Sequence, residues 1–239
     1  GVATPAVRHS IDQIRADQPL EESLTTHFRG IAARANYLSA DRPECQFGAK
    51  EACRFMAQPT AMSAEALKRL GRYLVKFPRL VYFYPFQEEV THMDVYVDTD
   101  HAGCLRTRKS TSGGCVVVGK HLLKSWSTTQ PTITLSSGEA ELHGVVRGAA
   151  TGLGFLSLLA DFGVIILMRL WTDSTASQGI CARQGLGKIR HLDVLQTLCR
   201  AILAPKSAAE IRLWPSGPLP VGVLSCQDSH CHLFCEQVS

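Results

Sequence analysis

The sequence feature that most constrains the fold is an alternating strand that is followed by two more strands and a capped helix. Residues 93–98 read Met-Asp-Val-Tyr-Val-Asp, which places the acidic and aromatic side chains on one face of a strand and the valines on the other. The segments Gly113-Gly-Cys-Val-Val-Val-Gly119 and Leu122-Leu-Lys-Ser-Trp126 predict two further strands, joined by the short connection Gly119-Lys-His121. Three antiparallel strands in succession are the simplest topology for this order.

The sequence after these strands predicts a helix, a strand and a second helix. Ser136-Ser-Gly-Glu139 matches a capping box, in which a serine hydroxyl accepts the Glu139 backbone N–H and the Glu139 carboxylate accepts the serine N–H. This helix should run towards Leu159. An apolar run at 164–171 predicts a buried strand, and Thr175-Ala-Ser-Gln178 predicts the start of the next helix. With a helix expected over 191–204 and a strand over 209–214, the chain should form an α/β domain with a mixed sheet.

The first third of the chain has a different, helical pattern. Residues up to Pro19 show no sustained periodicity, and we expect a linker over 1–22. Apolar residues at helical spacing predict three helices between Leu20 and Leu80, the third of which should open at Ser63. Leu80-Val-Tyr-Phe-Tyr84 is aromatic and β-branched, which predicts a strand that Pro85 ends. The expected organisation is therefore a linker, a helical segment over 23–86, an α/β domain over 92–204 and a divergent tail over 205–239.

Composition excludes several classes of protein. The chain of 239 residues is 45% hydrophobic and 19% charged, which excludes a disordered, collagenous or coiled-coil protein. A net charge of +4 is too small to indicate nucleic-acid binding by itself. Nine cysteines without a regular framework favour reduced thiols, and hence an intracellular, cytoplasmic or nuclear protein. The longest apolar stretch, Leu153 to Trp171, is interrupted by charged residues and glycines, so no membrane association is expected.

Three acidic residues occupy positions that indicate a metal site. Asp98 ends the first strand, Glu141 lies in the first turns of the capped helix, and Asp173 follows a later strand. Ends of strands and starts of helices meet at one edge of an α/β sheet, where ligands usually bind. Carboxylates that cluster there repel one another unless a divalent cation such as Mg²⁺ neutralises them. Two such ions support the in-line hydrolysis of a phosphodiester, so this trio predicts a nuclease.

Neighbouring acids are weaker candidates for this role. Glu139 is two positions from Glu141 and therefore points in a roughly opposite direction on the helix, where capping gives it a structural role. Glu141 instead shares its face with the small residues Gly144, Val145, Gly148 and Gly152, which would let the helix lie close to the sheet. For Asp94 and Asp100 we favour solvated acids at the strand edge over metal ligands.

Six sequence blocks, in a fixed order, carry a resemblance to a known family. The blocks are Val97-Asp98-Thr-Asp-His-Ala-Gly103, Thr107-Arg-Lys-Ser-Thr-Ser-Gly-Gly114, Ser125-Trp-Ser-Thr-Thr-Gln130, Leu135-Ser-Ser-Gly-Glu-Ala-Glu-Leu142, Trp171-Thr-Asp-Ser-Thr-Ala176 and Lys188-Ile-Arg-His-Leu-Asp193. Their order and approximate spacing resemble the ribonuclease H domain of copia-type retrotransposon Pol polyproteins. Residues 26–84 resemble the connection that follows the reverse-transcriptase domain in the same polyproteins.

This resemblance implies a function. It implies a ribonuclease H-like mixed sheet with flanking helices, preceded by a small helical connection segment. The family hydrolyses the RNA strand of RNA–DNA hybrids with Mg²⁺ or Mn²⁺, and Asp98, Glu141 and Asp173 fall on three of its metal-binding acids. The implied partners are the hybrid and the reverse-transcriptase domain of the same polyprotein. Another nuclease or integrase of the same fold family is disfavoured by the order of the blocks.

The end of the chain departs from the family pattern. The family carries a fourth Asp after its last strand, and nothing after Trp214 restores that block. A decayed retroelement fragment that only binds nucleic acid, or has no function, is therefore the alternative. A zinc site is disfavoured in the tail because its cysteines and histidines lack paired metal-ligand spacing. These tail residues are Cys226, His230, Cys231, His232 and Cys235.

Basic residues beside the proposed acids predict a surface that binds nucleic acid. Between His101 and Gln130 the chain carries five basic residues and no acidic one: Arg106, Arg108, Lys109, Lys120 and Lys124. Such side chains could hold phosphates, and Ser110, Thr111 and Ser112 could add hydroxyl contacts. Arg190 belongs to a second basic patch, where His191 is a possible accessory residue although a structural role is favoured. Trp126, Trp171 and Trp214 are expected to lie in the core or on a sheet face.

Overall fold

The computed structural model describes residues 2–182 and 209–213, and the chain divides into two units with a boundary between Phe83 and Tyr84. The helix expected over 191–204, together with Arg190, His191, Trp214 and the tail, lies outside the described residues. Each unit has its own hydrophobic core.

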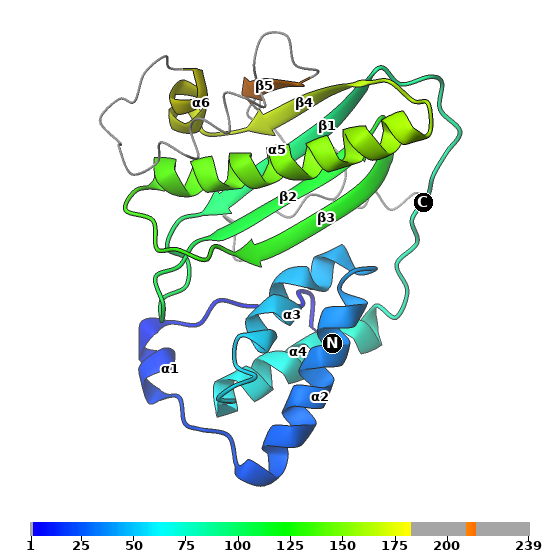
Figure 1. Ribbon diagram of the computed structural model, residues 1–239. Helices are drawn as coiled ribbons and strands as arrows, with labels where there is room; N and C mark the ends of the chain where they lie inside the picture. The colour runs from blue at the N-terminus through cyan, green and yellow to red at the C-terminus, as the bar shows by residue number, and fades with distance from the viewer. Residues whose placement is uncertain (1, 183–208, 214–239) are drawn as a thin grey trace. The chain divides into compact units, whose positions relative to one another are not determined.

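The first unit is helical, as the sequence predicts. It contains α1 (Ile11–Ala16), α2 (Glu22–Leu38), the short 3-10 helix η1 (Pro43–Cys45), α3 (Gln46–Cys53) and α4 (Ala61–Lys76), coloured blue to cyan in Figure 1. Phe28, Ala32 and Leu70 are among the buried residues where α2, α3 and α4 pack together. Two details differ from expectation: α1 forms inside the predicted linker, and α4 is capped by Thr60 rather than opened by Ser63.

The prediction of a strand at residues 80–84 is wrong. Residues 77–91 contain no helix or strand, and the side chains of Val81 and Phe83 are 74% and 78% exposed. No neighbouring strand pairs with this segment among the described residues, so β propensity alone does not make it a strand. The Tyr84 hydroxyl instead donates to the carbonyl oxygen of Leu122 at 3.3 Å.

The second unit is built on a mixed five-stranded sheet. Its strands are β1 (His92–Asp100), β2 (Thr111–Val118), β3 (His121–Thr129), β4 (Leu167–Thr172) and β5 (Ala209–Leu213). They lie in the order β3-β2-β1-β4-β5, with β1, β2 and β3 antiparallel and with β4 and β5 added in parallel (Figure 1). This is the mixed sheet that the sequence predicts. The strand β4 begins later than expected because Gly163 and Val164 still donate to carbonyls of the preceding helix.

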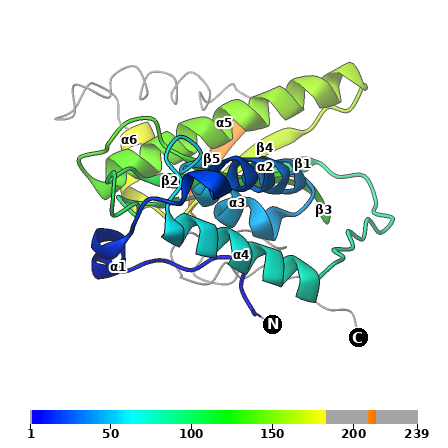
Figure 2. The same cartoon turned by 90° about the horizontal axis from the view of Figure 1, so that it is seen from below.

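Helix α5 (Ser137–Asp161) lies along one face of this sheet in both views (Figures 1 and 2). Its buried side chains, such as Leu142 and Val145, pack against Val95, Val97 and Met168 of the strands. By length and hydropathy α5 could cross a membrane, a test that core helices of other proteins also pass, and 33% of its apolar window is buried. The next helix, α6 (Thr175–Ala182), is capped by Ser174, whose hydroxyl accepts the Ser177 N–H at 3.1 Å.

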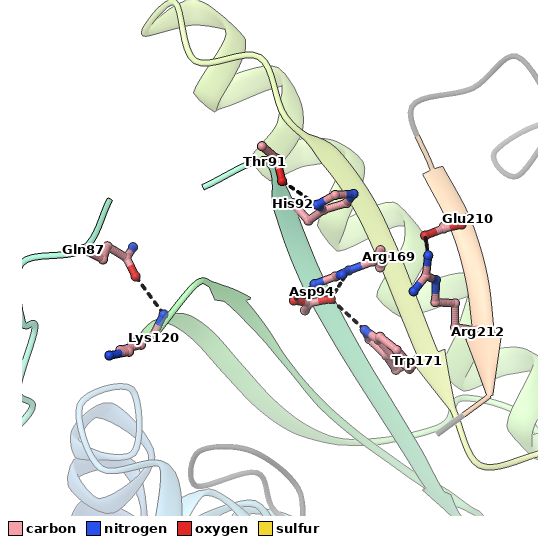
Figure 3. A network of polar contacts seen from close by, with 9 residues as sticks. All are labelled: Gln87, Thr91, His92, Asp94, Lys120, Arg169, Trp171, Glu210 and Arg212. Carbon is pink, nitrogen blue, oxygen red and sulfur yellow. Dashed lines mark hydrogen bonds and ion pairs between the residues drawn. The ribbon is translucent and has the colours of Figure 1, made fainter. Parts of the chain in front are cut away.

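An ion pair on the opposite face of the sheet ties β1 to β4 (Figure 3). Asp94 accepts two hydrogen bonds from the Arg169 guanidinium and one from the Trp171 indole, each 2.7 Å long. The prediction that Asp94 is a solvated acid is therefore wrong, since the residue is only 8% exposed. Trp171 lies on the sheet face and stacks on Tyr96 with ring centroids 6.2 Å apart, and Trp126 is a core residue, as expected.

Candidate active site

The sheet register brings Asp98 and Asp173 to the same level. Strands β1 and β4 are parallel neighbours in which Tyr96 pairs with Trp171, so the residues two positions further along each strand also lie side by side. Asp98 is in β1, and Asp173 is the first residue after β4. Glu141 approaches the same edge from α5, which packs against both β1 and β4.

The three carboxylates predicted from the sequence form a cluster. One ligand atom from each of Asp98, Glu141 and Asp173 lies within 4.8 Å of the others, and within the described ranges no fourth acid joins this group. The Glu141 side chain is buried, that of Asp98 is half-buried and that of Asp173 is exposed. The cluster therefore opens to solvent on the Asp173 side. Asp100, which follows in the same strand, is not a member.

Electrostatics make Glu141 the unusual member of the cluster. Burial, with the negative charges of Asp173 and then Asp98, raises the pKa of its carboxyl from 4.5 to about 9. Its Oε2 atom is buried and has no hydrogen-bond partner. A buried acceptor without a donor, beside two like charges, is the environment that a cation relieves. The three carboxylates supply the hard oxygen ligands that Mg²⁺ or Mn²⁺ binds, so the residues present fit such an ion.

The first turn of α5, which precedes Glu141, is held by hydrogen bonds at the start of the helix. The Ser136 hydroxyl accepts the Glu139 N–H at 3.2 Å, as predicted. The Glu139 carboxylate, however, accepts the N–H of Leu135 at 2.8 Å rather than that of the capping serine. Glu139 is thus a structural residue. A contact that sequence reasoning missed comes from Gln130, whose side chain donates to the Ala140 carbonyl at 2.8 Å.

The basic loop after β1 begins at the edge of the sheet that carries the acids. Residues 101–110 connect β1 to β2, and the backbone N–H of Arg108 donates to the Cys104 carbonyl at 2.7 Å. Arg106 and Arg108 are exposed, and Lys109 is half-buried. The loop therefore presents positive charge next to the strand end of Asp98. Lys124 lies further away, because it pairs with Val116, whereas Asp98 is level with Gly113.

The hydroxyl contacts predicted for nucleic acid are not available on the surface. Ser110, Thr111 and Ser112 are 0%, 3% and 2% exposed. The Ser110 hydroxyl accepts the Ala102 N–H at 3.0 Å and contacts the Thr134 hydroxyl at the same distance. These side chains hold the loops together inside the unit. The prediction that Ser110 binds nucleic acid is wrong, because its hydroxyl is buried and bonded within the protein.

Comparisons with known proteins agree with the sequence blocks. No protein-family profile matches the chain. It is 35% identical over 124 residues to an uncharacterized mitochondrial protein of Arabidopsis thaliana, covering 52% of the chain and 51% of that protein. It is 30% identical over 172 residues to the retrovirus-related Pol polyprotein from transposon RE1 of the same plant, covering 71% of the chain but only 12% of the polyprotein. The ribonuclease H1 of Halobacterium salinarum superposes with a TM-score of 0.38 at 16% identity, covering 52% of this chain and 86% of that one.

The second unit is a mixed five-stranded sheet with flanking helices, as the sequence predicts. The chain is similar in sequence to retrovirus-related Pol polyproteins from two transposons of Arabidopsis thaliana. The chain spans about half the length of the mitochondrial protein and 12% of the RE1 polyprotein.

Proposed function

We propose that the chain is a retrotransposon-derived ribonuclease H that hydrolyses the RNA strand of RNA–DNA hybrids by two-metal catalysis with Mg²⁺ or Mn²⁺. The observation that carries this proposal is the cluster of Asp98, Glu141 and Asp173, in which three carboxylates from three elements converge within 4.8 Å. Homology to retrotransposon Pol polyproteins supports the assignment to this class of nuclease.

Each acid has a role that follows from its position. Two bound divalent cations would neutralise the cluster, activate water for attack on phosphorus and stabilise the leaving oxygen. Asp98 and Asp173 would bind metal from adjacent strand ends. Glu141 would bind metal through one carboxylate oxygen and use the other to accept a hydrogen bond from the attacking water. As the water oxygen bonds to phosphorus, the bond from phosphorus to the 3′ oxygen breaks, which leaves a 3′-hydroxyl and a 5′-phosphate.

The charged loop next to the acids supports a nucleic-acid substrate. Arg106, Arg108 and Lys109 would contact phosphates of the hybrid backbone, and Lys124 would reach a more distant phosphate. Recognition would then depend on the shape of the backbone and on 2′-hydroxyls rather than on base sequence. Arg190 and His191 remain candidates for substrate contact outside the described residues.

The proposed nuclease would act as part of a larger Pol polyprotein inside the cell. The matched part is a small share of each Pol polyprotein, and residues 26–84 resemble a reverse-transcriptase connection. We therefore propose the reverse-transcriptase domain of the same polyprotein as a partner. An intracellular, cytoplasmic or nuclear location is part of the proposal, on the ground that the nine cysteines follow no regular disulfide framework.

Cleavage of an end-labelled RNA–DNA hybrid tests the function. The purified chain is expected to cut the RNA strand with Mg²⁺ or Mn²⁺ and to leave it intact with EDTA. Asp98→Asn and Glu141→Gln should each lower the rate by at least about 100-fold, because each replaces a negatively charged carboxylate of the metal site with a neutral amide. Asp100→Asn is the matched control, since it removes the same charge from the same strand outside the cluster and should retain activity.

The opposite result would identify the alternative function. A folded chain that binds the hybrid but cuts it under no metal condition would contradict the nuclease proposal. It would favour a decayed retroelement product that only binds nucleic acid. Binding is measured separately, by fluorescence anisotropy with a labelled hybrid in EDTA.

A further inference from the structure

Gln130 connects two elements that border the acid cluster. It follows the last residue of β3, and its side chain is 4% exposed. Its Nε2 donates to the Ser112 hydroxyl of β2 and to the Ala140 carbonyl of α5, each at 2.8 Å. Its backbone N–H donates to the carbonyl of Ser110, also at 2.8 Å, so the residue is fixed at both its backbone and its side chain.

The contact with Ala140 acts on Glu141 through a shared peptide group. The carbonyl of Ala140 and the backbone N–H of Glu141 belong to one planar unit, so a hydrogen bond to that carbonyl fixes the unit from which the Glu141 side chain starts. The helix itself uses this carbonyl for residue 144, and the second lone pair accepts the bond from Gln130. Gly144 lies close to the same place, since a Cβ there would be 3.9 Å from the Ser112 hydroxyl oxygen.

The chemistry of the partners defines the orientation of the Gln130 amide. A backbone carbonyl can only accept a hydrogen bond, so the amide nitrogen must face Ala140. This leaves Oε1 buried without a hydrogen-bond partner. The Gln130 amide therefore bridges β2 and α5 although its own oxygen stays without a partner. This arrangement indicates that the role of the side chain is to fix these two elements relative to each other.

Glu141 needs such a restraint. Its carboxyl group is buried, and one of its oxygens lies within 4.8 Å of an oxygen of Asp98 and of Asp173, so a small movement of α5 would take it out of the cluster. The capping bonds of Ser136 and Glu139 hold the entry of α5, but both act before Ala140. Among the described residues, the Gln130 side chain at the end of β3 donates a hydrogen bond to the peptide group between Ala140 and Glu141.

We infer that Gln130 is a positioning residue, which holds the first turns of α5 against β2 so that Glu141 stays in the acid cluster. For catalysis this inference rests on the proposed function, in which Glu141 binds metal and orients water. For the position of α5 it stands on the hydrogen bonds alone.

Gln130→Met tests this role, because methionine keeps the length and approximate volume of the side chain and removes both donors. Ser112→Ala is the matched control, since it deletes one partner in the same buried network and keeps the bond to Ala140. Three quantities are measured on the full chain: hydrogen–deuterium exchange along α5, Mn²⁺ affinity without nucleic acid, and kcat and KM for hybrid cleavage.

Gln130→Met should raise exchange in residues 137–145 but not in the later turns of α5. It should weaken Mn²⁺ binding about 10-fold and lower kcat roughly 10- to 100-fold with little change in KM. Ser112→Ala should change these quantities much less. Unchanged exchange in Gln130→Met, or equal effects of the two substitutions, would overturn the inference.

The two proposals fail in distinguishable ways. If the wild-type chain cuts the hybrid and Gln130→Met behaves like it, the positioning role is wrong and the nuclease stands. If the wild-type chain does not cut but Gln130→Met still loosens the start of α5 selectively, the nuclease is wrong and the positioning role stands.

Discussion

At the scale of single residues, Glu141 links the stability of the fold to its chemistry. In the unfolded chain its carboxyl group loses a proton near its ordinary pKa of 4.5, whereas in the folded chain the pKa is about 9. Between these pH values the folded state binds the extra proton, so stability falls as pH rises. The metal-free protein should therefore lose stability between about pH 5 and pH 9.

This pH dependence predicts the effect of Glu141→Gln. The substitution removes the carboxyl group that resists ionisation, so it should raise Tm at pH 8 by roughly 5 °C while having little effect at pH 5. Thermal unfolding followed by circular dichroism in EDTA measures both values. Asp100→Asn should lack this pattern, and a Glu141→Gln protein that melts like the wild type at pH 8 would show that the carboxyl group is not destabilising. Added Mg²⁺ should stabilise the wild type at pH 8 and have little effect on the variant.

At the scale of elements, the glycines of α5 set its distance from the sheet. A Cβ on Gly148 would lie 2.3 Å from Cγ1 of Val97, and one on Gly152 would lie 2.2 Å from Sδ of Met168. Gly154, in the same helix, has no atom within 4 Å of such a Cβ. The close approach of α5 therefore depends on the first two glycines and not on the third.

Alanine substitutions at Gly148 and Gly154 should change the free energy of unfolding in opposite directions. Gly148→Ala should destabilise the protein by about 1–3 kcal/mol, because a methyl group would overlap a strand side chain in the core. Gly154→Ala should stabilise it by up to about 1 kcal/mol, because alanine favours the helix and meets open space. Urea unfolding of the two variants in parallel compares them, and a stabilising Gly148→Ala would mean that α5 lies further from the sheet.

The elements also show what the sequence predicts and what it does not. Periodicity and capping predicted α5 and the succession of strands and helices along the α/β unit, because those signals are local. Asp94 was misjudged because its partner Arg169 lies 75 residues later in the chain. Residues 80–84 have the composition of a strand, but a strand also needs a neighbour. The contact between Gln130 and Ala140 depends on how β3 and α5 pack, so only the fold reveals it.

At the scale of the whole molecule, the distribution of charge matters more than its total. A net charge of +4 spread over 239 residues gives weak, general attraction to nucleic acid. The exposed Arg106 and Arg108 occupy one loop beside the acids, whereas Lys68 and Arg72 lie in α4 of the other unit. Local phosphate contacts and general attraction therefore predict different results when equal charge is removed from these two places.

The salt dependence of hybrid binding separates the two cases. If the loop contacts phosphates, Arg106→Gln with Arg108→Gln should reduce the slope of log K against log salt concentration by roughly 2, since each lost contact contributes about 0.9. Lys68→Gln with Arg72→Gln removes the same charge and should leave the slope almost unchanged. The measurement is anisotropy of a labelled hybrid in EDTA from low to moderate salt. Equal reductions by the two pairs would mean that the total charge binds the hybrid, and the loop would then have no special place in recognition.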